Sequence, residues 1–293
     1  MEPTNHCNLR CLICPNKLLK EGEKGFMEFE LFKKITDEAA GFVFELSMAH
    51  RGESLLHPQI LDMIRYAKEK GLFTRLHTNG TLLSEEMARG ILSSGLDRLS
   101  FSFDGYNKET YESIRRGGDF DQTITNINRF FELKKRIHAK KPITVVEVLS
   151  FNGEKRPNHS SLKNSLMALF PHLSPRNLVI KKVHNWAGEL EADDRAPRFS
   201  LCLFPWNALT VFWNGSVACC PQDFFGHYIV GNTKDFHLRE IWNGNRLVWL
   251  RKKLASHTVD DLPACSGCDR LRRKTFLGAP QEYLWKFITR RMP

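Results

Sequence analysis

The sequence has no long apolar run, and this absence argues against a membrane-spanning helix. Mean hydropathy is -0.37, and no stretch approaches the roughly 20 apolar residues that a span needs. The first residues also lack the basic start and the apolar stretch of a secretory signal, so we expect a cytoplasmic protein. Eight cysteines in such a protein indicate metal or redox chemistry rather than a disulfide framework.

Acidic residues are too few to balance the basic ones. There are 43 Lys and Arg residues against 33 Asp and Glu residues, which gives a formal net charge of +10. A solvated basic surface and an anionic partner both account for this excess. Much of it gathers in a C-terminal tail, 271–293, among apolar residues. That tail either packs against its own domain, which we expect, or lies on a membrane surface as an amphipathic helix.

Short β-rich runs alternate with helical stretches from about residue 28 to residue 185. The predicted strands are 42–48, 72–76, 98–103, 143–151 and 178–183. The predicted helices are 29–40, 58–70, 84–94, 107–115, 121–139 and 159–170. This alternation predicts parallel strands with right-handed crossovers, in a barrel or an open α/β sheet. In barrels of this kind the working residues follow the carboxyl ends of the strands.

One strand is missing from this pattern. A group of three cysteines begins at residue 7, which leaves almost no room for a strand before it. We therefore expect either a barrel that is open at this edge or a first strand that precedes the printed start.

The composition changes after residue 188. A charged linker, 189–200, leads to a second domain at 201–270, with short strands at 208–213 and 216–219. A tight Asn214-Gly215 turn joins these strands, and one helix is expected near 237–254.

The first three cysteines, Cys7, Cys11 and Cys14, follow a C-x3-C-x2-C spacing, and no further cysteine occurs before Cys202. Soft sulfur ligands suit the iron of iron–sulfur clusters, and thiolates this close can hold one cubane. Three ligands leave one iron without a protein ligand, so that iron can bind a substrate or cofactor. A zinc knuckle or free thiols are the alternative.

The segment Cys7-Asn-Leu-Arg-Cys11-Leu-Ile-Cys14 resembles the hallmark of radical S-adenosylmethionine (SAM) enzymes. The resemblance implies a partial (β/α)6 TIM-like barrel over 1–188 and a [4Fe–4S] cluster whose open iron is chelated by SAM. It also implies an electron donor of the flavodoxin or ferredoxin type. An electron from the cluster would cleave SAM to a 5′-deoxyadenosyl radical that removes a substrate hydrogen.

The same resemblance implies which residues contact SAM. Gly52 and Glu53 stand where the family often has Gly-Gly-Glu-Pro, whose carbonyls and Glu hold the SAM ammonium. Ser102 is expected to contact the methionyl part and Arg115 its carboxylate, while Ile13 takes the place of an aromatic residue beside adenine. The predicted SAM contacts are Ile13, Gly52, Glu53, Asn79, Ser102 and Arg115.

A second group holds five cysteines, and four thiols can bind zinc or an iron–sulfur cluster equally well. Their spacing resembles the short SPASM, or twitch, module, which implies one auxiliary [4Fe–4S] cluster. The Gly215-x4-Cys220 spacing selects Cys220 over Cys219, which we expect to be a small buried residue. The implied ligands are Cys202, Cys220, Cys265 and Cys268.

The combined resemblance predicts a radical SAM oxidoreductase or isomerase. We expect oxidation (dehydrogenation) or epimerisation of a small sugar-like substrate, with modification of a ribosomally made peptide as the alternative. A zinc-ribbon protein that binds nucleic acid is the alternative from another class, because a charge of +10 suits phosphate contacts.

Overall fold

The computed structural model describes residues 1–150, 159–191, 199–276 and 279–280. The chain forms two compact units, each described here by itself. The first is Met1–Val183 with Phe212–Asn214, and the second is His184–Val211 with Gly215–Pro293. The predicted domain limits and the 189–200 linker stay predictions, and most of the predicted tail, 281–293, lies outside the described residues.

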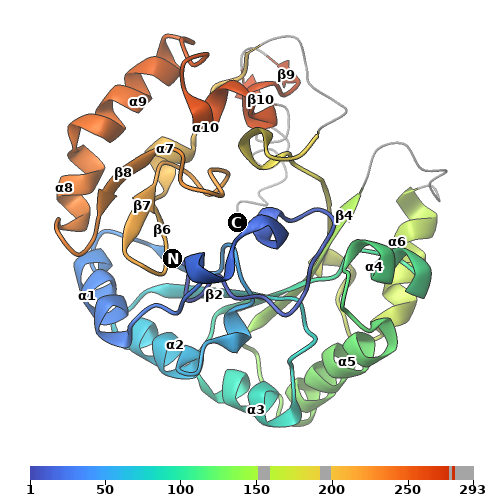
Figure 1. The fold of residues 1–293 in the computed structure, drawn as a ribbon. Coiled ribbons are helices and arrows are strands. Elements are labelled where there is room, and N and C mark those ends of the chain that lie inside the picture. The colour runs from blue at the N-terminus through green and yellow to red at the C-terminus, as the bar shows by residue number, and fades with distance from the viewer. Residues whose placement is uncertain (151–158, 192–198, 277–278, 281–293) are drawn as a thin grey trace. The chain divides into compact units, whose positions relative to one another are not determined.

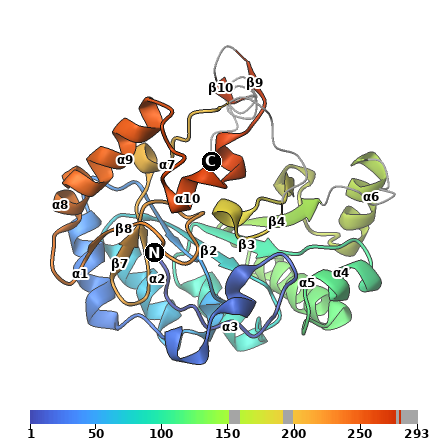
Figure 2. The same ribbon diagram turned by 45° about the horizontal axis from the view of Figure 1, so that its top comes forward.

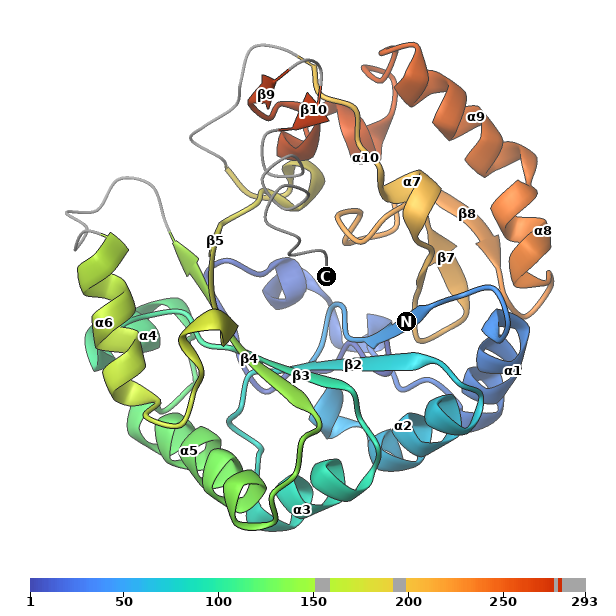
Figure 3. The same ribbon diagram turned by 180° about the vertical axis from the view of Figure 1, so that it is seen from behind.

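The first unit is built on one parallel sheet whose strands are ordered as in the sequence (Figure 3). Its strands are β1 (Glu45–Met48), β2 (Phe73–Thr78), β3 (Arg98–Ser102), β4 (Ile143–Ser150) and β5 (Leu178–Lys182). Parallel neighbours joined by helical crossovers confirm the predicted α/β fold.

Helices follow one another along the outer side of this sheet (Figure 1). They are α1 (Phe29–Ala39), α2 (Ile60–Glu69), α3 (Glu85–Ser93), α4 (Lys108–Ile114), α5 (Phe120–Arg136) and α6 (His159–Leu169). Ser84 caps α3 as its sequence indicates, since its hydroxyl accepts a hydrogen bond from the Met87 amide. Phe101 of β3 packs edge-to-face on Phe130 and Phe131 of α5, which identifies the helix-covered face of the sheet.

No strand precedes the cysteine loop within the described ranges. Met1 instead lies beside β1: its amino group donates to the Ser47 carbonyl at 2.9 Å. Its carbonyl accepts from the Ala49 amide at 3.1 Å, which completes the pattern of a single parallel bridge. The cysteine loop therefore starts at the β1 edge of the sheet.

The second unit contains a three-stranded antiparallel sheet and short helices (Figure 2). Its strands are β6 (Thr210–Val211), β7 (Ser216–Ala218) and β8 (Ile229–Asn232), and β9 (Thr275–Phe276) pairs separately with β10 (Ala279–Pro280). Its helices are α7 (Phe204–Asn207), α8 (Leu238–Asn243), α9 (Asn245–Ala255) and α10 (Pro263–Ser266). The predicted β6–β7 hairpin is confirmed, and Gly215, which directly precedes β7, has the positive φ of +90° that the turn requires.

The prediction of one helix over 237–254 is wrong. Gly244 has φ -66° and ψ 150°, an extended conformation that ends α8 and begins α9. The hydrophobic periodicity continues across the break, whereas the glycine backbone leaves the helix. Among the described residues, no helix is both long and apolar enough to cross a membrane.

Candidate functional site

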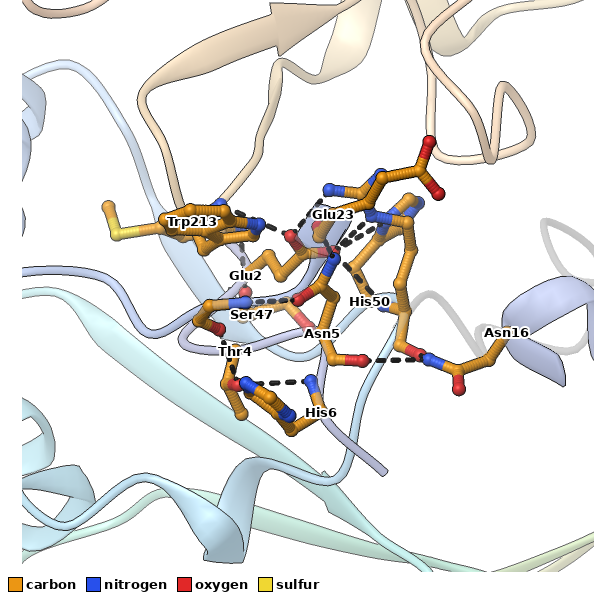
Figure 4. Close-up of polar contacts among 12 residues, drawn as sticks. Glu2, Thr4, Asn5, His6, Asn16, Glu23, Ser47, His50 and Trp213 are labelled. Carbon is orange, nitrogen blue, oxygen red and sulfur yellow. Dashed lines mark hydrogen bonds and ion pairs between the residues drawn. The ribbon is translucent and has the colours of Figure 1, made fainter. Parts of the chain in front are cut away.

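The residues before Cys7 are fixed by polar contacts that close the base of the cysteine loop (Figure 4). The Thr4 hydroxyl donates to the Gly25 carbonyl at 2.7 Å, and the Gly25 amide donates to the Asn5 side chain at 2.8 Å. Beyond the loop, the Asn16 amide group donates to the carbonyls of Asn5 at 2.8 Å and of Arg51 at 2.6 Å. Both ends of the cysteine loop are thereby joined to each other and to the segment after β1.

Glu2, which lies five residues before Cys7, is fully buried (0% exposed). It accepts hydrogen bonds from Arg51 Nε at 2.6 Å, from a second Arg51 nitrogen at 2.8 Å, and from the Trp213 amide at 3.1 Å. Burial raises the pKa of Glu2, but hydrogen bonds from Arg51 and His50 outweigh it and lower the pKa to about 2. The Arg51 guanidinium also lies 3.7 Å from the centre of the Phe212 ring. Arg51 is thus held on both sides, and Gly52 follows it directly.

Gly52 and Glu53 pack against the backbone of the cysteine loop. A Cβ on Gly52 would lie 2.4 Å from the Thr4 carbonyl oxygen and 2.5 Å from that of His6, so only glycine fits. The Glu53 amide donates to the same His6 carbonyl at 2.9 Å. The Glu53 side chain is 3% exposed and accepts from the Asn79 amide at 2.7 Å. Burial raises the pKa of Glu53, so an approaching cation would stabilise its carboxylate.

Asn79 connects the end of β2 to the cysteine loop. Its side-chain amide donates to Asn8 Oδ1 at 2.9 Å, next to Cys7. Farther along the loop, the Leu12 amide donates to the carbonyl of Ile114 at 2.7 Å, at the end of α4. The predicted residues Gly52, Glu53 and Asn79 therefore meet at the cysteine loop.

The three thiols of Cys7, Cys11 and Cys14 lie close enough to affect one another's charge. Burial raises the pKa of Cys7 to about 11 and that of Cys14 to about 12. Each of these two sulfurs also accepts a backbone hydrogen bond from the residue two positions later, Leu9 or Asn16. Three soft, half-buried sulfurs, two of them held by the amides of later residues, fit an iron–sulfur cluster, whose positive iron would favour the thiolate forms.

Arg115 reaches the same loop but is paired with Asp104. A terminal guanidinium nitrogen of Arg115 donates to Asp104 Oδ2 at 2.6 Å, and the Leu149 amide donates to Asp104 Oδ1 at 2.7 Å. Burial lowers the pKa of Arg115, but the Asp104 carboxylate and the Cys11 sulfur raise it further. Arg115 Nε is buried without a hydrogen-bond partner, so one donor remains for a carboxylate such as that of SAM. The sequence did not identify Asp104 as this partner.

Ser102 and Ile13 are the two remaining predicted SAM contacts. Ser102 ends β3 and is half-buried, and Ile13 is half-buried on the cysteine loop next to Cys14. Their contacts with SAM stay predictions. Glu147 of β4 makes an ion pair with Lys181 at 2.6 Å.

The five cysteines of the second group all line one pocket. Cys265 and Cys268 come from α10 and the residues after it, and the Cys268 amide donates to the Cys265 carbonyl at 3.0 Å. Burial raises the pKa of Cys265 and Cys202 and brings that of Cys268 to about 12. The rest of the lining is mainly apolar and includes Leu250, Leu254 and Ala264, together with the polar residues Gln222 and Arg270. A closed set of soft sulfurs in an apolar setting fits a second cluster.

Cys219 and Cys220 differ within this pocket. Cys220 accepts a hydrogen bond from the Cys219 thiol and backbone hydrogen bonds from Gln222 and Asp223, which lower its pKa. Cys202 and Cys268 accept similar backbone bonds from the residue two positions later. Cys219 is 0% exposed, and its sulfur lies 3.7 Å from Asp223 Oδ2, an acceptor that would repel a thiolate. The geometry thus favours Cys220 as a ligand.

A family model for the radical SAM superfamily matches residues 1–154, which is more than half of the chain. The chain belongs to the radical SAM superfamily. A second model, described as an iron-sulfur cluster-binding domain (SPASM), matches residues 202–269. This radical SAM enzyme therefore uses SAM and two [4Fe–4S] clusters, one in each matched region. The match decides against the alternative of a zinc-ribbon protein.

Among curated relatives, the chain is 29% identical to the tungsten-containing aldehyde ferredoxin oxidoreductase cofactor-modifying protein of Pyrococcus furiosus. That match covers 92% of this chain and 86% of the relative. This chain is also 34% identical to the AdoMet-dependent heme synthase of Methanosarcina barkeri, over 43% of this chain and 36% of that protein. A GTP 3′,8-cyclase of Desulforamulus reducens is 28% identical over 56% of this chain and 50% of its own length.

Solved structures show the same fold. BtrN in complex with AdoMet and 2-DOIA has a TM-score of 0.62 at 18% identity, covering 91% of this chain and 90% of BtrN. SuiB of Streptococcus suis, bound to its precursor peptide SuiA, has a TM-score of 0.64 at 13% identity. That match covers 85% of this chain but only 65% of SuiB.

Proposed function

We propose that this radical SAM enzyme oxidises or epimerises a small, polar, sugar-like substrate. The observation that carries the proposal is the difference between its two thiol groups. Cys7, Cys11 and Cys14 offer three ligands to the SAM-binding cluster, whereas the second pocket offers four. The proposed auxiliary ligands are Cys202, Cys220, Cys265 and Cys268.

When bound, the three-cysteine cluster supplies the electron that cleaves SAM to a 5′-deoxyadenosyl radical. The chain's own residues orient SAM. Arg115 Nε, buried and without a partner, offers a charge-assisted hydrogen bond to the SAM carboxylate. Glu53, buried between the Asn79 amide and the cysteine loop, offers its carboxylate to the SAM ammonium.

The four cysteines of the second pocket would supply every protein ligand of a second cluster, which would then exchange electrons without an open iron for SAM. A substrate that gives up a hydrogen atom becomes a substrate radical, and a radical that then loses one electron and one proton becomes a two-electron oxidation product. A cluster held in the pocket around Cys220 and Cys265 would accept that electron. A ferredoxin- or flavodoxin-type protein is the proposed reductant of the SAM-binding cluster.

Similar proteins support a small substrate. The names of three relatives specify a cofactor, heme or GTP, and BtrN was crystallised with 2-DOIA. SuiB with its bound SuiA supports the second candidate, a ribosomally made peptide. The relative from Pyrococcus furiosus matches 92% of this chain, and its name specifies modification of a cofactor, which favours the small substrate.

The test measures 5′-deoxyadenosine made anaerobically from SAM and dithionite with fractions of a cell extract. A dialysable fraction that resists protease should stimulate its formation. Stimulation confined to a protease-sensitive fraction would overturn the small-substrate proposal and favour the peptide. Deuterium uptake by the product in heavy water then separates epimerisation, which restores a hydrogen, from oxidation, which does not.

A further inference from the structure

The sheet face opposite the helices carries an unusual set of polar residues. Because Phe101 points to α5 and side chains alternate along a strand, Arg98, Ser100 and Ser102 of β3 point to the other face. The β2–β3 register places Arg75 beside Arg98 and His77 beside Ser100. Both neighbours therefore share that face.

Charged groups from all five strands of the sheet meet on this face. Arg75 makes an ion pair with Glu45 of β1 at 3.2 Å, and Lys181 of β5 makes one with Glu147 of β4 at 2.6 Å. The electrostatic surroundings of His77 include Glu147, Arg75, Lys181 and Arg98, so these residues lie together. Burial lowers the pKa of His77 to about 4, so its imidazole is neutral at neutral pH. The opposite charges within each of the two ion pairs cancel, so Arg98 gives this face a net charge of one positive.

Several donors on this face lack partners. Ser100 is 1% exposed, and its hydroxyl makes no hydrogen bond in the structure. The Nε atoms of Arg75 and Arg98 are buried and also without partners. Across the described residues, Arg98 makes no ion pair. A buried donor without an acceptor is costly for folding, so a clustered set of them indicates a site shaped for a ligand that accepts hydrogen bonds.

We infer that Arg75, Arg98 and Ser100 bind an oxyanion of the substrate, a carboxylate or a phosphate. Guanidinium groups form paired, charge-assisted hydrogen bonds with both of these groups, and a serine hydroxyl donates a further one. The neutral His77 imidazole offers one more N–H without adding charge. That the anion belongs to the substrate rests on the proposed function.

The position along the strands agrees with this role. Ser100 lies two residues before Ser102 on β3, and His77 lies two residues before Asn79 on β2. Two strand residues span about 7 Å and four span about 13 Å. The oxyanion would therefore lie about 7 to 13 Å along the strands from their carboxyl ends, where Glu53 and Asn79 lie. This spacing suits a small molecule with an anionic group at one end and its reacting C–H bond at the other.

The experiment measures the thermal midpoint of the anaerobic holoenzyme against inorganic phosphate or acetate, with chloride keeping the ionic strength constant. The midpoint of the wild-type protein should rise with the logarithm of anion concentration, because binding stabilises the folded state. In Arg98→Met, the phosphate concentration that gives the same rise should be at least about tenfold higher. The control Arg65→Met removes an exposed arginine that pairs with Asp62, and it should keep the wild-type response.

A second variant keeps the test decisive if Arg98→Met fails to fold. Ser100→Ala removes a buried hydroxyl without a partner, so its midpoint without anion should equal or exceed the wild-type value. The same variant should need severalfold more phosphate for the same rise. No response of the wild type to either anion would overturn the inference, as would an unchanged response in folded Arg98→Met or in Ser100→Ala. The anion that raises the midpoint at the lower concentration, phosphate or acetate, shows whether the site prefers a phosphate or a carboxylate.

Failure of this inference and failure of the proposed function give different results. The wild-type sample used for the titration is also assayed for 5′-deoxyadenosine. Anion binding that depends on Arg98 without stimulation by any dialysable extract fraction would leave the site intact but refute the proposed function. Stimulation by the dialysable fraction without anion binding would refute the oxyanion site but leave the proposed function intact.

Discussion

Replacing Glu2 by Gln should destabilise the first unit more than any exposed charge change. The substitution leaves the guanidinium of Arg51 buried without its counter-charge, and Arg51 precedes the Gly52–Glu53 segment. It also weakens the acceptor for the Trp213 amide. The consequence should appear both in stability and in the retention of the first cluster.

The magnitude follows from the electrostatics of Glu2. A pKa that falls from 4.5 in the unfolded chain to about 2 in the folded protein corresponds to about 3 kcal/mol of stability. Removing one partner of a buried ion pair costs about 3–5 kcal/mol, which agrees. At about 2–4 °C for each kcal/mol, the thermal midpoint should fall by about 6–12 °C.

The sign of the pH dependence is fixed by the direction of the same pKa. Because folding lowers the pKa of Glu2, its contribution is complete above pH 4.5 and is lost as the pH falls through about 2. The difference in stability between the wild type and Glu2→Gln should therefore be constant at neutral pH and shrink below pH 4.5.

The assay is anaerobic thermal unfolding of the holoenzyme with iron measured on the same samples. The matched control is Glu30→Gln, which removes an exposed carboxylate paired with Lys33 and should shift the midpoint by about 1–2 °C or less. The double variant Glu2→Gln/Arg51→Met should lose less stability than the sum of the two single variants. Equal shifts for Glu2→Gln and Glu30→Gln, or strict additivity in the double variant, would refute the buried pair.

Three further predictions concern the two cluster sites. Gly52→Ala should lose about half of the bound iron, because its Cβ would meet backbone oxygens at 2.4–2.5 Å; full iron content would show that the loop can move. Glu53→Gln should weaken SAM binding about 10- to 100-fold by equilibrium dialysis with iron content unchanged, and equal affinity would remove Glu53 from the SAM site. Cys220→Ala should lose the auxiliary cluster while Cys219→Ala keeps it; equal iron loss in both would reverse the ligand assignment.

Much of the sheet could be predicted because its signals are local. The alternation of apolar strands with helices indicated β1 to β5 in order, and Ser84 marked the start of α3 through its own hydroxyl. β8 was missed, since its four residues contain Gly231 and gain their structure by pairing with β7. The break at Gly244 was missed because the flanking apolar spacing fits one continuous helix.

The residues of the site also fall into those that the sequence could predict and those that it could not. The cysteines could be found from spacing, because a loop that holds a cluster brings its ligands from neighbouring positions. The partners that fix the loop come from distant positions and leave no local pattern. Glu2 and Arg51 are 49 residues apart, and Asp104 and Arg115 are 11 apart. The sequence places Asp104 in the turn after β3, but its ion pair with Arg115 depends on where α4 ends.

The measurement that tests the account most directly is 5′-deoxyadenosine formation by the Cys7→Ala/Cys11→Ala/Cys14→Ala variant. The wild type, with about eight irons in two clusters, should cleave SAM under strict anaerobiosis with dithionite. The triple variant should keep about four irons, on the second cysteine group, and form no 5′-deoxyadenosine. A folded triple variant that still forms it would contradict the assignment of the SAM-binding cluster to these three cysteines.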